Sequence, residues 1–466
     1  MSADTSLRSL VLAQRADAAL FIEGRTGRAV TGADLADAVA RWDPVVAQLR
    51  PGAVVALATA DPCTFATNYL GLLAARATVA PVDPGAPAEV LRLDLAELGA
   101  DALVTEDALT MVPGGRTARH GVLLRSSGST GPRKLIPLSE PQLLHVAAAV
   151  VAAHSLTPDD VGYSPLPLFH VNAQVVGLLS TLVAGSTLVL DQRFSRRSFW
   201  STVATHRVSW LNAVPAILAI LEHQGDPHQG LPAGCEQLRF ARSASAPLPL
   251  PVLRRFEKTY GVPVVETYGM TEAASQICAN PVLERRAGSV GRPVEVELEV
   301  RDAHGQPVPP ETVGQVHIRG RGVVAGALPG GWLATGDLGR QDEDGYLYLT
   351  GRVSEVINRG GEKLFPRHIE DALTGDPQIA AAVVVGQPDG VLGEVPVAYI
   401  VAHSAGDATS AAVTARARCA RLLSRAQQPV QIHIVRSLPT GATGKVSRKR
   451  VRELAPELAA GAGASA

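Results

Sequence analysis

Patterns of buried strands and of helices alternate along the chain from about residue 54 to residue 274. The run VVALATA at 54–60 is continuous and apolar, as in a buried strand, and the helical pattern at 64–82 leads into a second strand. The same alternation recurs at 208–221 and 252–274. Strands separated by helices are typical of an α/β fold with parallel pairing, in which ligands bind at the carboxyl ends of the strands.

A different pattern follows Gly288. Short segments at 294–300, 314–320 and 345–351, each bounded by Gly, Pro or Asp, predict a small antiparallel β unit. A shorter α/β piece comes after it, and 466 residues are more than one core usually supports. We therefore expect a large N-terminal domain of α/β subdomains plus the β unit at 1–351, a small α+β domain at 352–455 and a disordered tail at 456–466.

The composition excludes several classes of function. Hydrophobic residues make up 46% of the chain, and the net charge of −1 argues against a general role in binding nucleic acid or a membrane surface. No apolar run reaches transmembrane length, and the N-terminus lacks the pattern of a secretory signal. Four scattered cysteines without a C-x-x-C pair argue against a disulfide scaffold or a zinc site and favour a cytoplasmic protein.

The stretch SSGSTGPRK at 126–134 carries the groups that surround a bound polyphosphate: glycines, hydroxyls and a cation, Lys134. Apolar runs at 121–124 and 135–138 flank it, so we expect a loop between two strands instead of a strand-to-helix turn. The stretch does not match the P-loop pattern G-x-x-x-x-G-K-[ST]. Taken alone, an ordinary Ser/Gly surface turn is equally compatible with it.

Lysine is scarce in this chain. Only five of the 43 basic residues are lysines: Lys134, Lys258, Lys363, Lys445 and Lys449. Because an ammonium group is not interchangeable with a guanidinium, the remaining lysines are candidates for required roles. Lys445 lies in the Gly-rich stretch at 439–450, which is not a P-loop because Val446 stands where Ser or Thr is needed. A basic, solvated tail is the alternative for this stretch.

Two further stretches present oxygen ligands where a nucleotide could bind. In VVETYGMTEAA at 264–274 a strand ends before Thr271 and Glu272, which could hold a phosphate and Mg²⁺, although a helix cap would use the same residues. In GGWLATGDLG at 330–339 Asp337 is expected in a Gly-rich turn. A carboxylate there suits a pair of ribose hydroxyls, and a plain turn is the alternative.

Arg352 and His170 are less specific candidates. Arg352 lies at the expected domain boundary, where it could contact a ligand or only bridge the domains. His170 and Asn172 follow a Pro-bounded apolar run in PLFHVNAQ, and a lone histidine in such a place is more often packed and hydrogen-bonded than catalytic.

Together and in this order, these stretches resemble the adenylate-forming superfamily of acyl-CoA synthetases, peptide-synthetase adenylation domains and luciferases. The resemblance covers about residues 20–452 and rests on seven motifs: SSGSTGPRK, PLFH, RSASAPLP, YGMTEAA, TGD, GRVSEVINRGGEK and PTGATGK. RSASAPLP, with MTEAASQICANP and NRGGEK, is most similar to the branch of oxalate and other small-acid CoA ligases.

The resemblance implies a large N-terminal domain and a small mobile C-terminal domain with the active site between them. It also implies a two-step reaction of a carboxylic acid with ATP and CoA, with Mg²⁺ as the cofactor. A carboxylic acid attacks the α-phosphate of ATP to give acyl-adenylate and pyrophosphate, and the thiol of CoA then displaces AMP. Such chemistry depends mostly on positioning and charge stabilisation.

The resemblance further implies a role for each matched residue. The phosphates would be held by Ser126, Ser127, Gly128, Ser129, Thr130, Gly131 and Lys134. The adenine would lie between Ala246, Pro247 and Tyr268, and the ribose would bind Asp337 and Arg352. Gly269 would be a further nucleotide-binding residue. Glu272 would ligate Mg²⁺ and Thr271 would contact the α-phosphate. Lys445 would bridge the carboxylate and the α-phosphate during catalysis. His170 would border the acyl pocket, and Ser354 would be the hinge.

Some positions depart from the family pattern. Ser354 stands where Asp or Lys is usual at the hinge, and the loop between Gly326 and Gly331 is shorter than is typical. Ser275 stands where the oxalate-like branch often has His, which argues against oxalate itself. Arg242 could pair with a second carboxylate of the substrate or could simply serve structure.

We therefore expect an AMP-forming ligase that joins a small or medium carboxylic acid to CoA. The alternative within the family passes the activated acid to a carrier-protein thiol, an amine or another non-CoA nucleophile. A non-catalytic binding protein is a third possibility, and the joint presence of the phosphate-binding, metal-binding and catalytic residues argues against it.

Overall fold

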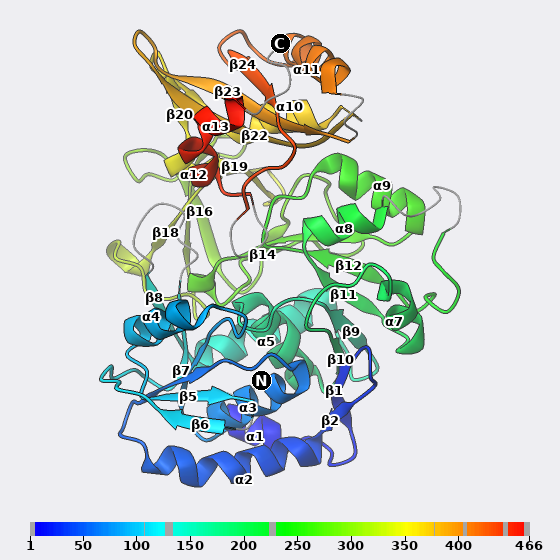
Figure 1. Ribbon diagram of the computed structural model, residues 1–466, viewed down its shortest axis with the longest axis vertical. Coiled ribbons are helices and arrows are strands. Elements are labelled where there is room, and N and C mark those ends of the chain that lie inside the picture. The colour runs from blue at the N-terminus through cyan, green and yellow to red at the C-terminus, as the bar shows by residue number, and fades with distance from the viewer. Residues whose placement is uncertain are drawn as a thin grey trace.

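The computed structural model describes most of the chain, and Figure 1 shows its arrangement. The described residues are 5–106, 108–125, 134–222, 230–376, 378–403, 408–440 and 446–460. Within them the strands form four sheets, and the sheet built from the last part of the chain lies at the top of Figure 1, away from α1 and α2. No helix in these ranges has the length and apolar character needed to cross a membrane.

The first sheet has six strands in the order β6-β5-β3-β4-β7-β8, with a parallel centre and an antiparallel strand at each edge. In that order its strands are Ala108–Met111, Ala102–Thr105, Val54–Leu57, Thr78–Pro81, Gly121–Arg125 and Leu135–Ser139. The helices of this part are α2 (Gly32–Gln48), α3 (Pro62–Ala74), α4 (Ala88–Leu98) and α5 (Glu140–His154).

The second sheet has nine strands in the order β15-β14-β13-β12-β11-β9-β10-β1-β2, and the run from β13 to β1 is parallel. In that order they are Arg292–Pro293, Cys278–Ala279, Val264–Tyr268, Phe240–Ser243, Trp210–Ala213, Val161–Ser164, Thr187–Leu190, Ala19–Glu23 and Ala29–Thr31. The helices here are α1 (Leu7–Leu12), the π-helix η1 (Ala173–Leu179), α6 (Ser180–Ala184), α7 (Phe199–Thr205), α8 (Pro215–Glu222) and α9 (Leu250–Tyr260).

Helix α2 illustrates how the sequence builds these layers. The Thr31 hydroxyl accepts a hydrogen bond from the Asp34 N–H, and the Asp34 carboxylate accepts from the Thr31 N–H, which forms a capping box. Leu35, Val39 and Trp42 follow at helical spacing and are buried in a cluster that also contains residues of both sheets. The apolar face of α2 therefore covers the core that the first two sheets share.

The third sheet is the predicted antiparallel β unit, with strands β16 (Glu297–Arg301), β17 (Gly314–Arg319), β18 (Leu333–Gln341) and β19 (Leu347–Arg352) in sequence order. The sequence pattern predicted three of its segments and placed no strand at 333–341. Short 3₁₀ turns stand beside this sheet: η2 (Thr271–Ala273), η3 (Pro329–Gly331) and η4 (Val353–Glu355).

The fourth sheet comprises β21 (Glu362–Leu364), β20 (Ile357–Arg359), β23 (Gly393–Ala402), β22 (Ile379–Asp389) and β24 (Gln431–Ile434). With it go α10 (Pro366–Thr374), α11 (Ala408–Leu422), α12 (Arg448–Glu453) and α13 (Ala455–Ala460). Two apolar clusters here contain only residues from 357 onward. The α/β fold with a large N-terminal and a smaller C-terminal domain is thus confirmed, while the boundary at 351/352 stays a prediction.

The structure differs from the expected disordered tail at 456–466. Helix α13 covers Ala455–Ala460, and Ala455 is buried against the C-terminal sheet in the cluster that includes Val451. An apolar anchor of this kind orders a terminal segment that composition alone would leave disordered. The final stretch 461–466 lies outside the described residues.

Candidate active site

Three predicted nucleotide-binding residues meet at the carboxyl end of β13. The Tyr268 hydroxyl, at the last position of that strand, donates to Asp337 Oδ2 at 2.6 Å, and Arg352 Nε donates to Asp337 Oδ1 at 2.9 Å. Asp337 and Arg352 are also register partners in β18 and β19. A strand end of the parallel sheet and two strands of the β unit therefore converge on one carboxylate.

The electrostatics of this cluster favour a fixed arrangement of charges. Asp337 and Tyr268 are buried, and burial, followed by the adjoining Asp337 carboxylate, raises the pKa of the Tyr268 hydroxyl well above its ordinary value. Burial opposes the charge on Arg352, but the attraction of Asp337 and Glu355 outweighs it and raises the pKa of the guanidinium. Tyr268 thus stays a proton donor and Arg352 stays a cation around one acceptor.

The expectation that Asp337 lies in a Gly-rich turn is wrong. It lies inside β18, whose pairing with β19 shifts register between Leu338 and Gly339. Gly336 has φ +79°, a conformation that glycine adopts without strain, so the glycines bend the strand and do not end it.

Thr271 and Glu272 lie in η2, in the connection between β13 and β14, and both side chains are partly exposed. The turn is tight: a Cβ on Gly269 would lie 1.3 Å from the Ser275 carbonyl oxygen, and Ser275 itself has φ +94°. The Glu272 carbonyl accepts from the Val324 N–H at 2.8 Å, which fixes the turn against the β unit. Gly269 is therefore required by the backbone approach, whatever its part in nucleotide binding.

The predicted phosphate loop is flanked as expected. Strands β7 and β8 pair antiparallel up to Arg125 and Leu135, so the segment between them connects two hairpin strands and no helix follows directly. Strand β8 contacts η2, which brings this hairpin to the turn that carries Glu272. Lys134 is exposed at the start of β8. The loop residues Ser126, Ser127, Gly128, Ser129, Thr130 and Gly131 lie outside the described residues.

Ala246 and Pro247 follow β12, the strand next to β13, and lead into α9. Ala246 is half-buried, Pro247 is exposed, and the preceding Ser245 has φ +73°. Because β12 and β13 are parallel, this turn and Tyr268 stand at the same edge of the sheet.

His170 and a buried polar cluster lie at a neighbouring strand end. His170 is half-buried in the turn before η1, and its carbonyl accepts from the Gln174 N–H. Asn172, two residues on, accepts from Asn212 Nδ2 at 3.1 Å and from Arg242 Nη1 at 3.3 Å. Burial lowers the pKa of Arg242 to about 9. Asn212 belongs to no sequence motif, and its only signal is a polar residue within an apolar strand.

Ser354 is exposed in η4, and its neighbour Glu355 forms an ion pair with Arg448 Nε at 3.1 Å. Arg448 also donates to Glu370 Oε2 at 2.7 Å. Burial raises the pKa of Glu370 to about 7, against the opposing attraction of Arg448. Lys445, three positions before Arg448, lies outside the described residues. These contacts nevertheless tie the expected hinge to the segment that follows Lys445.

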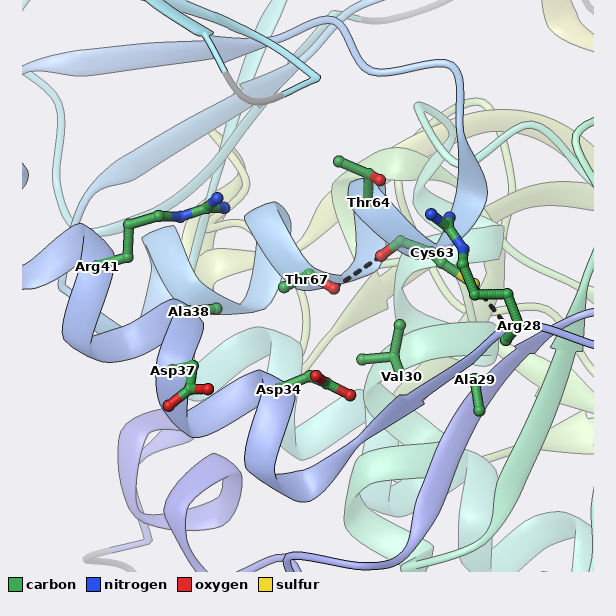
Figure 2. A pocket seen from close by; sticks show the side chains of 10 residues that line it. All are labelled: Arg28, Ala29, Val30, Asp34, Asp37, Ala38, Arg41, Cys63, Thr64 and Thr67. Carbon is green, nitrogen blue, oxygen red and sulfur yellow. Dashed lines mark hydrogen bonds between the residues drawn. The ribbon is translucent and has the colours of Figure 1, made fainter.

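A separate cavity of about 320 Å³ lies between β2, α2 and α3, and Figure 2 shows its lining. Arg28 at its rim pairs with Asp61, and the Thr67 hydroxyl donates to the Cys63 carbonyl. None of the predicted site residues lines it. We therefore place the candidate active site at the strand ends around Tyr268 and not in this cavity.

Two family models match the chain. The model described as AMP-binding enzyme matches residues 121–328, and the model described as AMP-binding enzyme C-terminal domain matches residues 368–445. The first match contains the predicted phosphate loop, Tyr268 and Glu272, and the second ends at Lys445. Asp337 and Arg352 lie between the two matched segments.

Two relatives extend these matches. A sulfoacetate–CoA ligase from Cupriavidus necator is 39% identical over 360 residues, which are 74% of this chain and 69% of that protein. An oxalate–CoA ligase from Arabidopsis thaliana is 32% identical over 464 residues, covering 87% of this chain and 89% of the relative.

A solved structure shares the whole architecture. The o-succinylbenzoate CoA synthetase from Bacillus subtilis, in complex with its acyl-adenylate intermediate, superposes with a TM-score of 0.83. The alignment covers 97% of this chain and 99% of that chain at 24% identity, a likeness of fold.

Proposed function

The chain belongs to the AMP-binding enzymes, the adenylate-forming acyl-CoA ligases, and on this premise we propose how its residues carry out the reaction. It is an AMP-forming acid–CoA ligase, as its relatives are. In the first step a carboxylate oxygen of the acid bonds to the α-phosphorus of ATP, and the bond to pyrophosphate breaks. In the second step the CoA sulfur bonds to the acyl carbon, AMP leaves, and the thiol proton is released.

The cluster of Tyr268, Asp337 and Arg352 is the observation that carries the nucleotide site. Each carboxylate oxygen has two lone pairs, so Asp337 can accept from ribose hydroxyls while it still accepts from Tyr268 and Arg352. The bond to Asp337 fixes the Tyr268 ring, which would cover one face of the adenine opposite Ala246 and Pro247. Arg352, half-exposed, would reach the second ribose hydroxyl.

Glu272 and the loop at 126–134 would bind the phosphates. Mg²⁺ usually binds proteins through one or two carboxylates together with substrate phosphates and water. A lone carboxylate fits that mode, and the described residues contain no group of three or more acidic, His or Cys side chains that would form a dedicated metal cage. Mg²⁺ would neutralise phosphate charge there, while Thr271 contacts the α-phosphate and Lys134 the outer phosphates.

Lys445 would bridge the attacking carboxylate and the α-phosphate, brought in by the C-terminal domain. A compact ammonium held there stabilises the charge that develops in the transition state. His170 would border the acid and the path of the thiol. Ser354 would be the pivot between adenylation and thioester formation, with the domain boundary beside it at 351/352.

The acid is proposed to be small and to carry a second acidic group. The two relatives are named for sulfoacetate and oxalate, and both of those acids have two acidic groups. The names of the relatives also favour CoA over a carrier protein as the acceptor. We place the enzyme in the cytoplasm, since its four cysteines are all free thiols and buried.

Pyrophosphate release across a panel of acids, with and without CoA, tests this proposal. The panel holds sulfoacetate, the dicarboxylates from oxalate to glutarate, and monocarboxylates of equal length. We expect sustained release that requires acid, ATP and CoA together, with AMP as the second product. Release indifferent to CoA would point to another acceptor, and no release with any acid would refute the ligase function.

A further inference from the structure

Arg242 is a buried cation whose partners are neutral. Only 1% of the residue is exposed, in the middle of the nine-stranded sheet. Its Nη1 donates to the amide oxygens of Asn212 and Asn172 at 3.1 and 3.3 Å. Its Nε is buried and has no hydrogen-bond partner within the part of the chain that the structure describes, and no ion pair to Arg242 is found there.

Other arginines of this sheet and its neighbours are treated differently. Arg125, largely buried, pairs with Asp94, and Arg255 pairs with the buried Glu222. A buried charge that is offset only by amide dipoles is costly, because those dipoles replace water incompletely. A bound anion would supply the negative charge that Arg242 lacks, which makes its surroundings a candidate binding site.

The position of Arg242 relates it to the nucleotide site. It is the third residue of β12, opposite Asn212 in the parallel strand β11, so both side chains lie near the carboxyl edge of the sheet. Four residues later the chain reaches Ala246 and Pro247, proposed to lie against the adenine. The Asn172 amide donates to the hydroxyl of the exposed Ser245 at 3.3 Å, which links the buried cluster to that surface turn.

The helix η1 adds a second relation to the acid site. Asn172 immediately precedes this seven-residue π-helix, and His170 lies three positions before its first residue. A π-helix inside an α-helical segment is rare and is frequently found at functional sites, because its wider turn redirects side chains. The same short segment thus holds the proposed border of the acyl pocket and one of the two amides that contact Arg242.

We propose that Arg242 binds the second acidic group of the substrate acid and so selects diacids over monoacids, with Asn172 and Asn212 as the residues that position its guanidinium. This inference rests on the acid–CoA ligase function proposed above. A carboxylate or sulfonate offers oxygens that pair with a guanidinium through two parallel hydrogen bonds. It would replace the amide oxygens as the partner of Arg242 and would also complete the buried Nε.

The buried charge of Arg242 should make the preference for diacids over monoacids strong. A site built to pair a charged group rejects an analogue that lacks it, because the site's own charge is then left buried and unpaired. An acid without the second group would still meet the nucleotide, Lys445 and CoA. We therefore expect monoacids to react slowly, through a raised KM.

The test measures kcat/KM by pyrophosphate release for the dicarboxylates from oxalate to glutarate, each paired with its monomethyl ester. Esterification removes one charge and keeps the chain length. In the parent enzyme the favoured dicarboxylate should exceed its ester by ~10–100-fold. Arg242→Met should lower the ratio of the two values to within a few-fold of one, and Arg242→Lys should restore it in part.

A second variant separates recognition from a structural role. Asn212→Asp would supply Arg242 with an internal carboxylate, so the fold should melt at the same or a higher temperature while the diacid-to-ester ratio falls. If Arg242 only served structure, this variant would leave the ratio unchanged. Arg255→Met, which breaks an ion pair on α9, is the matched control and should leave the ratio at the parent value.

The outcomes are distinct from those that test the ligase function. Equal losses for diacid and ester in both Arg242 variants, or a preference for monoacids in the parent enzyme, would overturn the role of Arg242 and leave the ligase standing. Absence of acid-dependent pyrophosphate release in the parent enzyme would overturn both. A parent preference for the diacid that Arg242→Met and Asn212→Asp both abolish supports the inference.

Discussion

Arg448 and Glu355 form an ion pair that joins the segment after Lys445 to the segment around Ser354. The distance from Arg448 Nε to Glu355 Oε2 is 3.1 Å, and the two side chains are about four-fifths buried. Because Arg448 also pairs with Glu370 on α10, its guanidinium connects three elements of the C-terminal half. The segment that follows Lys445 is thereby tied to the segment around Ser354.

Replacement of Arg448 tests this connection. Arg448→Met leaves Glu370 buried without its cation, which should destabilise the fold by about 3 kcal/mol at pH 8. The loss should be smaller at pH 6, where Glu370, with a pKa of about 7, is protonated. Denaturant unfolding at both pH values measures the difference. Arg452→Met, exposed on the same helix, is the control, and an equal loss in that variant would contradict the assignment.

Lys445→Ala should slow formation of the acyl-adenylate by ~10²–10³, the usual loss for one preorganised charge donor. It should spare thioester formation when the acyl-adenylate is supplied. Single-turnover assays of each half-reaction make the distinction. Lys449→Ala, which removes an exposed lysine on α12, should alter neither step. Unchanged adenylation by the Lys445 variant would remove this residue from the mechanism.

Asp337→Asn should raise the KM for ATP by ~10–100-fold, because it weakens two hydrogen bonds of the cluster as well as those to the ribose. Tyr268→Phe should have a milder effect, since the ring remains and only its hydroxyl bond to Asp337 is lost. Asp344→Asn, at an exposed acid that pairs with Arg286, controls for charge. If the two aspartate variants behave alike, Asp337 does not bind nucleotide.

Gly269→Ala should destabilise the protein by about 3 kcal/mol, at the upper end of the range for overpacking, because the new Cβ would meet the backbone oxygen of Ser275. The backbone would have to shift in the turn that carries Glu272. Gly390→Ala, where no atom lies within 4 Å of the added Cβ, is the matched control. Thermal unfolding of both variants decides the point, and equal melting temperatures would contradict the close approach.

Glu266 should give the protein a distinctive dependence on pH. Burial, against the weaker attraction of Arg367, raises the pKa of this carboxyl from 4.5 to about 7. Between those values the folded state holds a proton that the unfolded state releases, so the free energy of unfolding falls as pH rises. The fall amounts to about 3 kcal/mol for such a shift.

Melting curves at pH 5 and pH 8 test this dependence. Glu266→Gln keeps an acceptor for the Leu248 N–H and removes the titration, so its stability should fall less over this interval than that of the parent. Glu370, whose pKa is also raised to about 7, should still contribute to the pH dependence of stability in this variant. The exposed Glu343→Gln should keep the full fall. A Glu266 variant as pH-dependent as the parent would be inconsistent with the prediction.

Local patterns sufficed for much of the fold. The pattern of apolar residues predicted the parallel strands, and the flanks of the stretch at 126–134 predicted a loop between two strands, because each depends on neighbours in sequence. Strand β18 was missed because the glycines around Asp337, which normally indicate a turn, instead bend a strand. The expected disordered tail differs from the structure in its described part, up to Ala460, because one buried alanine, Ala455, anchors a helix that composition does not reveal.

The candidate site could be predicted from the sequence only in part. Motifs named Tyr268, Asp337 and Arg352, but the hydrogen bonds that join them span up to 69 positions of the chain and follow from tertiary packing alone. Asn212 and Glu370 carry no motif, and their roles appear only when parallel strands or helix faces bring them against an arginine. A functional role could be assigned from the sequence where the residues that share it are neighbours in the chain.

The separation of the apolar clusters bears on how the enzyme could change state. Among the described residues, every member of the clusters in the C-terminal sheet comes from position 357 or later, and the other clusters end by Leu349. A rotation about Ser354 would therefore open none of these clusters. The free energy of the surface polar contacts that such a rotation exchanges is comparable with what a nucleotide or a thiol contributes on binding. The substrates themselves could then select which face of the C-terminal domain completes the site.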